Sequence, residues 1–100
     1  MKVIESNKLI AEFMGYEVLY RPNSNGFIEL SETELCDVDD LQYHESWDWL
    51  MPVKDRVIPL TDDLPPKFYD MIVNGLITGD ITQVYNSCVE VIKFYNNLNK

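Results

Sequence analysis

The chain has 100 residues, of which 46% are hydrophobic, and its formal net charge is -9. A chain of this length can bury about two-thirds of its unfolded surface in one core, which predicts one small globular domain spanning residues 1–100. The 8 Lys and Arg residues form no basic stripe, which argues against direct binding to nucleic acid or to an anionic membrane surface.

The two cysteines, Cys36 and Cys88, form no CxxC pair, so the sequence favours reduced thiols over a disulfide framework or a zinc site. No apolar run is long enough for an export signal or a membrane span. We therefore expect a cytoplasmic protein that holds no metal and no cofactor.

The N-terminal part predicts a helix followed by a β-hairpin. Ser6–Gly15 carries a serine suited to a helix N-cap and a glycine suited to the position after the helix. Next, Tyr16–Arg21 and Phe27–Leu30 are apolar or β-branched runs separated by the turn residues Pro22–Gly26. These two runs are expected to pair, because Asn25 and Gly26 tolerate the positive φ that tight hairpins require.

The middle of the chain predicts a surface connection and then a helix. Ser31–Gln42 is polar and acidic, with too few apolar residues in register for a confident element. Ser46 can cap a helix that Pro59 ends, and a kink or a broken first turn is expected at Met51 because Pro52 lacks a backbone donor.

The C-terminal part predicts two further helices joined by a short link at Gly79 and Asp80. The last helix has the clearest apolar stripe, formed by Ile81, Val84, Tyr85, Cys88, Ile92 and Tyr95. The predicted fold class is therefore helix-dominant α+β: an N-terminal helix, a β-hairpin and three helices packed around one core.

The residues that carry chemistry do not form a catalytic signature. His44 is the only histidine, and Glu45 and Asp48 are its nearest carboxylates, but no nucleophile motif accompanies them. A calcium loop starting at Asp37 would need Gly at position 42 and Glu at position 48, where Gln42 and Asp48 stand. The sequence therefore assigns no catalytic, metal-binding or cofactor-binding residue.

A long acidic stretch is the main candidate for recognition, since no Lys or Arg occurs between Pro22 and Val53. Its acidic residues are Glu29, Glu32, Glu34, Asp37, Asp39, Asp40, Glu45 and Asp48. Trp47 and Trp49 lie about 200° apart on a helix, so one should face the core and the other should be partly exposed. The candidate protein-binding residues are Tyr43, His44, Asp48, Trp49, Asp37, Asp39 and Asp40.

Three segments resemble a group of uncharacterised short proteins from Bacteroides-type bacteria and their phages or prophages, some of them associated with the phage α-β-α sandwich domain. The segments are Asn7–Gly15 (NKLIAEFMG), Tyr43–Val53 (YHESWDWLMPV) and Val84–Asn96 (VYNSCVEVIKFYN). The resemblance implies an origin in a mobile element or a gut bacterium and transfers no catalytic residue. Residues 59–79 look helical where a sandwich would add strands, so the helix-dominant prediction is kept.

Several functions follow as hypotheses. The first is a non-enzymatic accessory protein of a phage or mobile element that binds another protein. The alternatives are an acidic mimic of nucleic acid that inhibits a DNA-binding protein, and a small enzyme that uses His44. Self-association into a homodimer is also expected, because Phe94, Tyr95 and Leu98 extend apolar surface beyond the main stripe of the last helix. Trp47 is expected to anchor its helix to the last helix.

Overall fold

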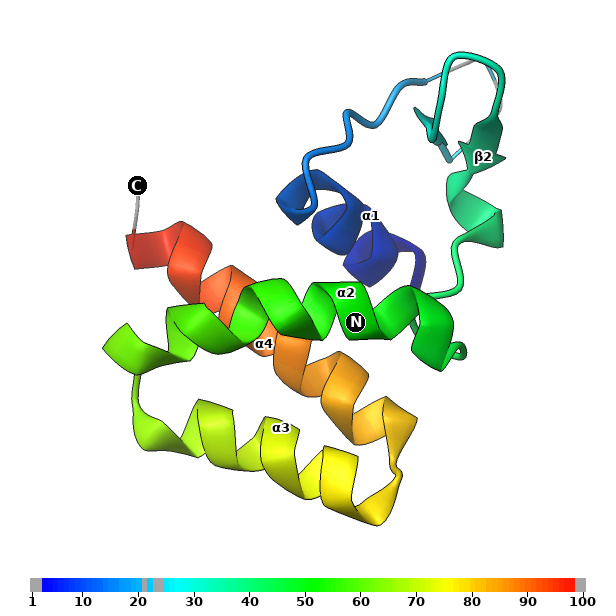
Figure 1. Cartoon of the computed structure of the whole chain (residues 1–100). Helices are drawn as coiled ribbons and strands as arrows, with labels where there is room; N and C mark the ends of the chain where they lie inside the picture. The colour runs from blue at the N-terminus through cyan, green and yellow to red at the C-terminus, as the bar shows by residue number, and fades with distance from the viewer. Residues whose placement is uncertain (1–2, 21, 23–24, 99–100) are drawn as a thin grey trace. The chain divides into compact units, whose positions relative to one another are not determined.

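The computed structural model describes residues 3–20, 22 and 25–98 of the chain. Its elements follow the order helix, two strands, then helices, as Figure 1 shows. The chain divides into two compact units, Met1–Gln42 (unit 1) and Tyr43–Lys100 (unit 2), and each is described separately below. The predicted helix-dominant α+β class, with an N-terminal helix, a β-hairpin and later helices, is confirmed. The prediction of a single domain with one core stays a prediction.

Unit 1 begins with helix α1 (Val3–Phe13). Gly15 ends it as predicted: with φ of 97° its N–H donates to Glu12 O at 3.1 Å. The predicted N-cap at Ser6 is wrong, because the helix already includes Val3 and Ser6 is buried inside it. Ser6 therefore packs as a small interior residue of α1.

Asn7 connects α1 to the end of unit 1. Its side chain is only 2% exposed, and its Nδ2 donates a hydrogen bond of 3.2 Å to the Leu41 carbonyl. Leu41 follows a single 3₁₀ turn, η1 (Val38–Asp40), whose Val38 is also buried. A buried polar pair of this kind fixes which helix face meets the turn, since either group alone would be costly to bury.

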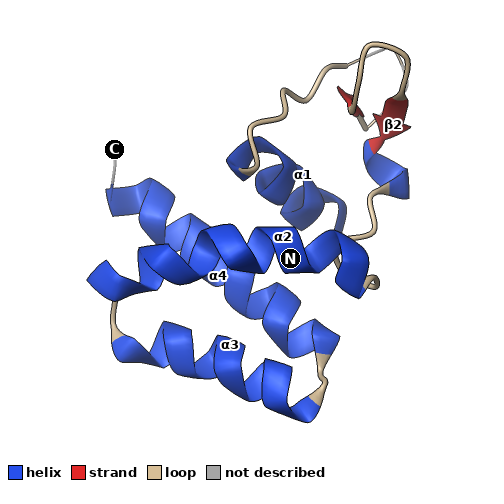
Figure 2. Cartoon of the chain, in the orientation of Figure 1, coloured by secondary structure: helices blue, strands red, loops and turns tan. Residues whose placement is uncertain are grey.

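The β-hairpin pairs different segments from those predicted. Strands β1 (Phe27–Glu29) and β2 (Leu35–Asp37) are antiparallel, with Ile28 opposite Cys36; Figure 2 shows these strands in red. The predicted first strand, Tyr16–Arg21, contributes only an isolated bridge in which Leu19 and Phe27 exchange two 2.8 Å backbone hydrogen bonds. β2 lies in the stretch that the sequence assigned to a surface connection.

The reason for the different pairing is local. Leu30–Glu34 closes β1 onto β2 with short-range backbone bonds, so β1 finds a partner only a few residues later in the chain. Gly26 has φ of 113°, and an added Cβ there would lie 2.8 Å from Val18 Cγ1 and 3.2 Å from the Leu19 carbonyl oxygen, so the position requires glycine. Arg21, Asn23 and Ser24 of the predicted strand and turn lie outside the described residues.

Unit 2 contains helices α2 (Trp47–Val57), α3 (Pro66–Thr78) and α4 (Ile81–Leu98), with a 3₁₀ segment η2 (Ile58–Asp63) between α2 and α3. Both α2 and α3 contact α4. Because two helices pack on it, α4 buries a wider arc than the predicted stripe. Its buried residues are Val84, Tyr85, Ser87, Cys88, Val89, Val91 and Ile92.

Of the two alternatives predicted at Met51, the broken first turn does not occur, since α2 is continuous from Trp47 to Val57 with Pro52 inside it, and the kink stays a prediction. The backbone acceptor that Pro52 leaves without a donor belongs to Asp48, four residues earlier. Asp48 and Pro52 are both exposed, so water can reach this carbonyl. Ser46 is the N-cap residue as predicted, but its side chain makes no capping hydrogen bond.

The link between α3 and α4 agrees with the sequence. Gly79 adopts the left-handed conformation with φ of 71°, and Asp80 Oδ1 accepts the backbone N–H of Gln83 at 3.1 Å. The helices also approach closely at Gly75, where an added Cβ would lie 2.6 Å from Val84 Cγ2. Glycine at position 75 is therefore a packing requirement, and α4 runs back along α3 (Figure 1).

Candidate protein-binding surface

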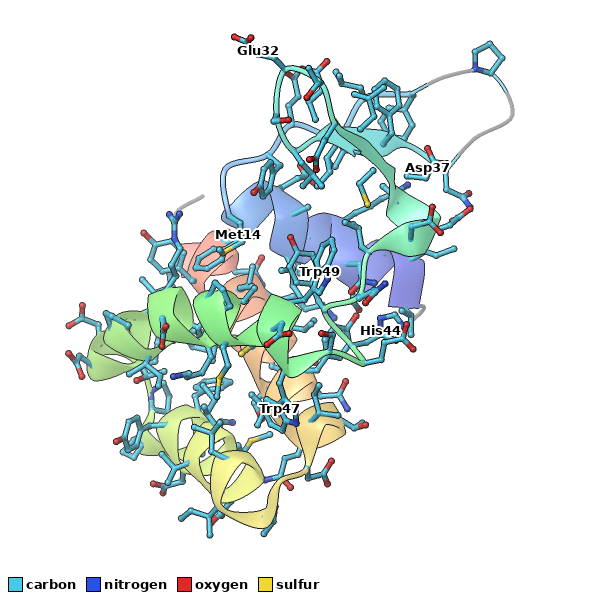
Figure 3. The ribbon with its side chains drawn as sticks, turned by 45° about the vertical axis from the view of Figure 1, so that its right-hand side comes forward. Met14, Glu32, Asp37, His44, Trp47 and Trp49 are labelled. Atoms are coloured by element: carbon cyan, nitrogen blue, oxygen red, sulfur yellow. The ribbon has the colours of Figure 1, made fainter. Side chains whose placement is uncertain are left out.

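Besides Glu29 of β1, five exposed carboxylates gather on the hairpin and the turn that follows it in unit 1. They are named here the hairpin carboxylates: Glu32, Glu34, Asp37, Asp39 and Asp40. The strand pattern explains their exposure: Ile28 and its partner Cys36 turn toward the interior of the unit, while Leu35 and Asp37 point the other way. Figure 3 labels Glu32 on the hairpin loop and Asp37 at the end of β2.

One hairpin carboxylate is held in place by a neighbouring side chain. Asp39 Oδ1 accepts a hydrogen bond of 2.8 Å from Asn25 Nδ2. Asp37 precedes η1 in an extended conformation, and its side chain makes no capping bond there. Asp37 can therefore meet a partner without giving up a role as a cap.

The pKa of the thiol beside these carboxylates is raised above its ordinary value. Burial raises the pKa of Cys36, and the negative charges of Asp40 and Asp37 raise it further. Because the thiolate is the nucleophilic form, this environment opposes covalent chemistry at Cys36. Among the described residues, no three His, Cys, Asp or Glu side chains are arranged to hold a metal ion.

The aromatic residues proposed for recognition belong to unit 2 and are less exposed than the sequence suggested. Tyr43 is only 4% exposed, and its ring meets Trp49 edge to face with centroids 5.3 Å apart. Trp47 and Trp49 are both half-buried, whereas the helical spacing predicted that one would face the core and the other would be partly exposed. Tyr43 thus works as a packing partner of Trp49, which leaves part of Trp49 for contact with another molecule.

His44 and Asp48 occupy different environments in unit 2. The His44 side chain is 30% exposed, its Nε2 lies 3.8 Å from Glu45 Oε2, and its ring lies 6.0 Å from that of Tyr85. The Glu45 contact brings a carboxylate to the imidazole and the Tyr85 contact is between rings, and the hypothesis of an enzyme that uses His44 stays a prediction. Asp48 is exposed in the first turn of α2, where a negative charge is favourable. Figure 3 labels His44 and both tryptophans.

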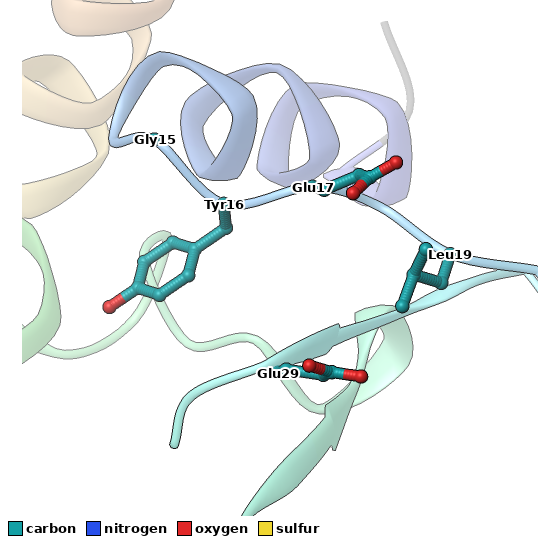
Figure 4. A pocket seen from close by; sticks show the side chains of 5 residues that line it. All are labelled: Gly15, Tyr16, Glu17, Leu19 and Glu29. Atoms are coloured by element: carbon teal, nitrogen blue, oxygen red, sulfur yellow. The ribbon is translucent and has the colours of Figure 1, made fainter. Parts of the chain in front are cut away.

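A small cavity in unit 1 was not predicted from the sequence. Its volume is about 160 Å³, and Gly15, Tyr16, Glu17, Leu19 and Glu29 line it (Figure 4). The sequence suggested pairing between these two segments, and pairing would have filled the space. The sequence feature that could have indicated the cavity is Gly15, because it ends α1 and sets the direction in which the chain leaves the helix.

Comparison of the chain with protein-family models, curated proteins and solved structures finds no match. The resemblance to short Bacteroides phage proteins therefore stays a prediction that rests on three sequence segments. Within the described part of the chain, no helix combines the length and apolar character needed to cross a bilayer.

Proposed function

We propose that the chain is a non-enzymatic accessory protein that binds a basic surface of another protein through its hairpin carboxylates. The observation that carries the proposal is that the five hairpin carboxylates are all exposed and lie in a stretch, Pro22–Val53, that contains eight acidic residues and no Lys or Arg. A phage or mobile-element origin and a cytoplasmic location are part of the proposal, and they rest on the sequence alone.

The physical basis is electrostatic complementarity. Neighbouring carboxylates repel one another, and lysine or arginine side chains of a partner relieve this repulsion while adding charge-assisted hydrogen bonds. Glu32, Glu34 and Asp37 are solvent-exposed, so their contribution falls as salt screens it over about 10 Å at 0.1 M. We therefore expect fast, salt-sensitive association with a basic partner.

The test is capture of partners from a lysate of a Bacteroides-type host with three forms of the full chain as bait. One is the wild type. The second, the hairpin variant, carries Glu34→Gln, Asp37→Asn and Asp40→Asn. The third, a control with the same change in net charge, alters three exposed residues of unit 2 and carries Asp62→Asn, Asp63→Asn and Asp70→Asn.

A partner that supports the proposal is retained by the wild type and the control and lost by the hairpin variant. Its basic surface is then confirmed with the purified protein. Equal retention by the hairpin variant and the control would show that net charge, or another surface, determines capture, and the proposal would be wrong.

The nucleic-acid-mimic alternative is a narrower form of the same proposal, in which the basic surface normally binds DNA. Closely spaced carboxylates can offer such a surface charges like those of a phosphate backbone. Duplex DNA that competes with the chain for the captured partner would support this form, and simultaneous binding of both would exclude it.

Self-association is a separate candidate and uses the end of α4. Phe94 and Tyr95 are each 37% exposed and Leu98 is 61% exposed, while Phe94 also packs on Phe68 with ring centroids 5.3 Å apart. We expect Leu98→Glu to shift a monomer–dimer equilibrium toward the monomer in analytical ultracentrifugation. A wild type that stays monomeric at high concentration would remove this candidate.

A further inference from the structure

The cavity of unit 1 lies where two segments begin to pair and then separate. Leu19 and Phe27 form a bonded bridge, so the next hydrogen-bonded pair in the same antiparallel register, beyond Val18 and Ile28, would be Glu17 with Glu29. The bridge is isolated, and both glutamates line the cavity instead.

The end of α1 explains the separation. Gly15 turns the chain with its positive φ, and the Tyr16 N–H is bound back to the Ala11 carbonyl at 3.0 Å. Tyr16 is therefore tied to the helix and cannot follow β1. The cavity is thus built by backbone hydrogen bonds on both sides, at Leu19 and at Tyr16, and does not depend on a chance side-chain position.

The lining combines negative charge with an aromatic wall. The carboxylates of Glu17 and Glu29 lie toward the end of the cavity near Leu19, and the Tyr16 ring lies toward the other end (Figure 4). Both glutamates are exposed and Tyr16 is half-buried. Among the residues that the structure describes, the lining includes two glutamates and no Lys or Arg, and a cation is the ligand that this charge complements.

We propose that this cavity binds the guanidinium group of an arginine side chain, supplied by the basic partner. The proposal rests on the proposed function for the source of that arginine. A guanidinium group is planar, donates several hydrogen bonds in a fork that suits carboxylates, and stacks on aromatic rings. The cavity's volume of about 160 Å³ holds several water-sized groups, at about 30 Å³ each, and so admits a planar side-chain head.

Two other cations fit the lining less well. A metal ion would need more ligands than two glutamates supply, and the described residues contain no cluster of three metal-binding side chains. A lysine ammonium is a compact point charge that gains little from the Tyr16 ring and cannot span two carboxylates with a rigid fork. A guanidinium group can both donate hydrogen bonds to a glutamate carboxylate and stack on the Tyr16 ring.

The experiment titrates the ¹⁵N-labelled full chain with N-acetyl-arginine-methylamide and follows amide chemical shifts. Its matched probe is N-acetyl-citrulline-methylamide, which keeps the shape and removes the charge. We expect shifts that saturate in the millimolar range at Gly15, Tyr16, Glu17, Leu19 and Glu29 with the arginine probe and no such shifts with the citrulline probe. An N-acetyl-lysine-methylamide probe should bind at least about 3-fold more weakly.

Variants locate the site. Glu17→Gln and Glu29→Gln should each weaken arginine binding by about 10-fold, whereas Glu12→Gln, an exposed residue of the same unit outside the cavity, should leave it unchanged. Spectra of the free variants show whether each one is folded. Equal binding of lysine and arginine, or shifts spread evenly over the hairpin carboxylates, would overturn the proposal.

The two proposals fail in different ways. If a captured partner depends on the hairpin carboxylates but the arginine probe does not bind the cavity, the cavity proposal is wrong and the proposed function stands. If the arginine probe binds the cavity but the hairpin variant captures the same partners as the control, the proposed function is wrong and the cavity remains a guanidinium site.

Discussion

The two units of the chain divide charge and core unequally. Unit 1 carries nine of the 17 acidic residues but only three of the 8 basic ones. Unit 2 contains α2, α3 and α4, and its core includes long aliphatic side chains such as Leu50, Ile72 and Ile92, all 0% exposed. Among the described residues of unit 1, the regular structure is one α-helix, two three-residue strands and the 3₁₀ turn η1.

The difference indicates that the two units contribute differently to stability and to surface charge. A hairpin of this size is only marginally stable without an apolar face to pack, so unit 1 depends on few residues, among them Ile28 and the Asn7–Leu41 hydrogen bond. Unit 2 has the larger apolar interior and should provide most of the stability. The acidic unit can therefore vary its surface with small effects on the helices.

The largest expected effect comes from comparing core truncations in the two units. Ile72→Ala should lower the free energy of unfolding by about 3–4 kcal/mol, because it empties a fully buried site in α3. Ile28→Ala should instead reduce hydrogen-exchange protection of the Leu30 and Val38 amides, which close the hairpin, and leave the α4 amides protected.

A matched control for Ile28 is Leu35→Ala, because Leu35 is in the same hairpin but 56% exposed. It should change stability by less than about 0.5 kcal/mol. If Ile28→Ala exposes the α4 amides as much as the hairpin amides, the two units unfold together and the proposed division of stability is wrong.

The next effect concerns the contact between α3 and α4. Gly75→Ala should destabilise unit 2 by about 2 kcal/mol, since the new methyl group would collide with Val84. An alanine at an ordinary helix position would instead stabilise by up to about 1 kcal/mol relative to glycine. Urea denaturation gives the sign directly, and a stabilised Gly75→Ala protein would contradict the close approach of the helices.

Trp47→Ala should lower the free energy of unfolding by about 2 kcal/mol. The half-buried position of Trp47 in α2 leaves less apolar area to lose than full burial, for which truncation costs about 3–5 kcal/mol. Chemical denaturation of the variant measures the loss. A loss of stability near zero, together with weaker partner binding, would show that Trp47 serves recognition and not the packing of unit 2.

The smallest effect is a pH dependence at Cys88. Burial raises the pKa of this thiol from 9.0 to about 12, and Lys54 opposes the shift only in part. The folded state thus holds the thiol proton more tightly than the unfolded state does. The contribution of this thiol to the free energy of unfolding is therefore complete below pH 9 and is lost as pH rises toward 12.

At pH 10 the free energy of unfolding should be lower by about 1 kcal/mol because of the Cys88 thiol. Comparing the pH dependence of unfolding for the wild type and Cys88→Ala removes the shared titration of tyrosines and lysines. Parallel curves between pH 8 and pH 11 would contradict the shift at Cys88.

Helix ends were the part of the fold that the sequence predicted best. Gly79 and Asp80 act through their own backbone and side-chain geometry, so short-range chemistry was sufficient to place them. Strand pairing was predicted less well, because β1 had two candidate partners and the short loop Leu30–Glu34 determined the outcome. The continuity of α2 through Pro52 was not foreseen, because the solvent exposure of this helix face is a tertiary property.

The candidate site shows the same limit. The exposure of Asp37, Asp39 and Asp40 was predicted from composition, since charged residues remain in water unless they are paired. The burial of Tyr43 was not predicted, because it depends on the ring of Trp49 across a turn. The cavity at Glu17 and Glu29 exists only because an expected pairing stops, which periodicity alone does not reveal.

The most direct test of the central claim is calorimetric titration of the purified partner with the full chain at low and moderate salt. The wild type and the unit 2 control should bind with similar affinity, and both should weaken as salt rises. The hairpin variant, which lacks the charges of Glu34, Asp37 and Asp40, should bind at least about 10-fold more weakly at low salt and should depend less on salt. Equal affinity and equal salt dependence for the hairpin variant and the control would contradict binding through the hairpin carboxylates.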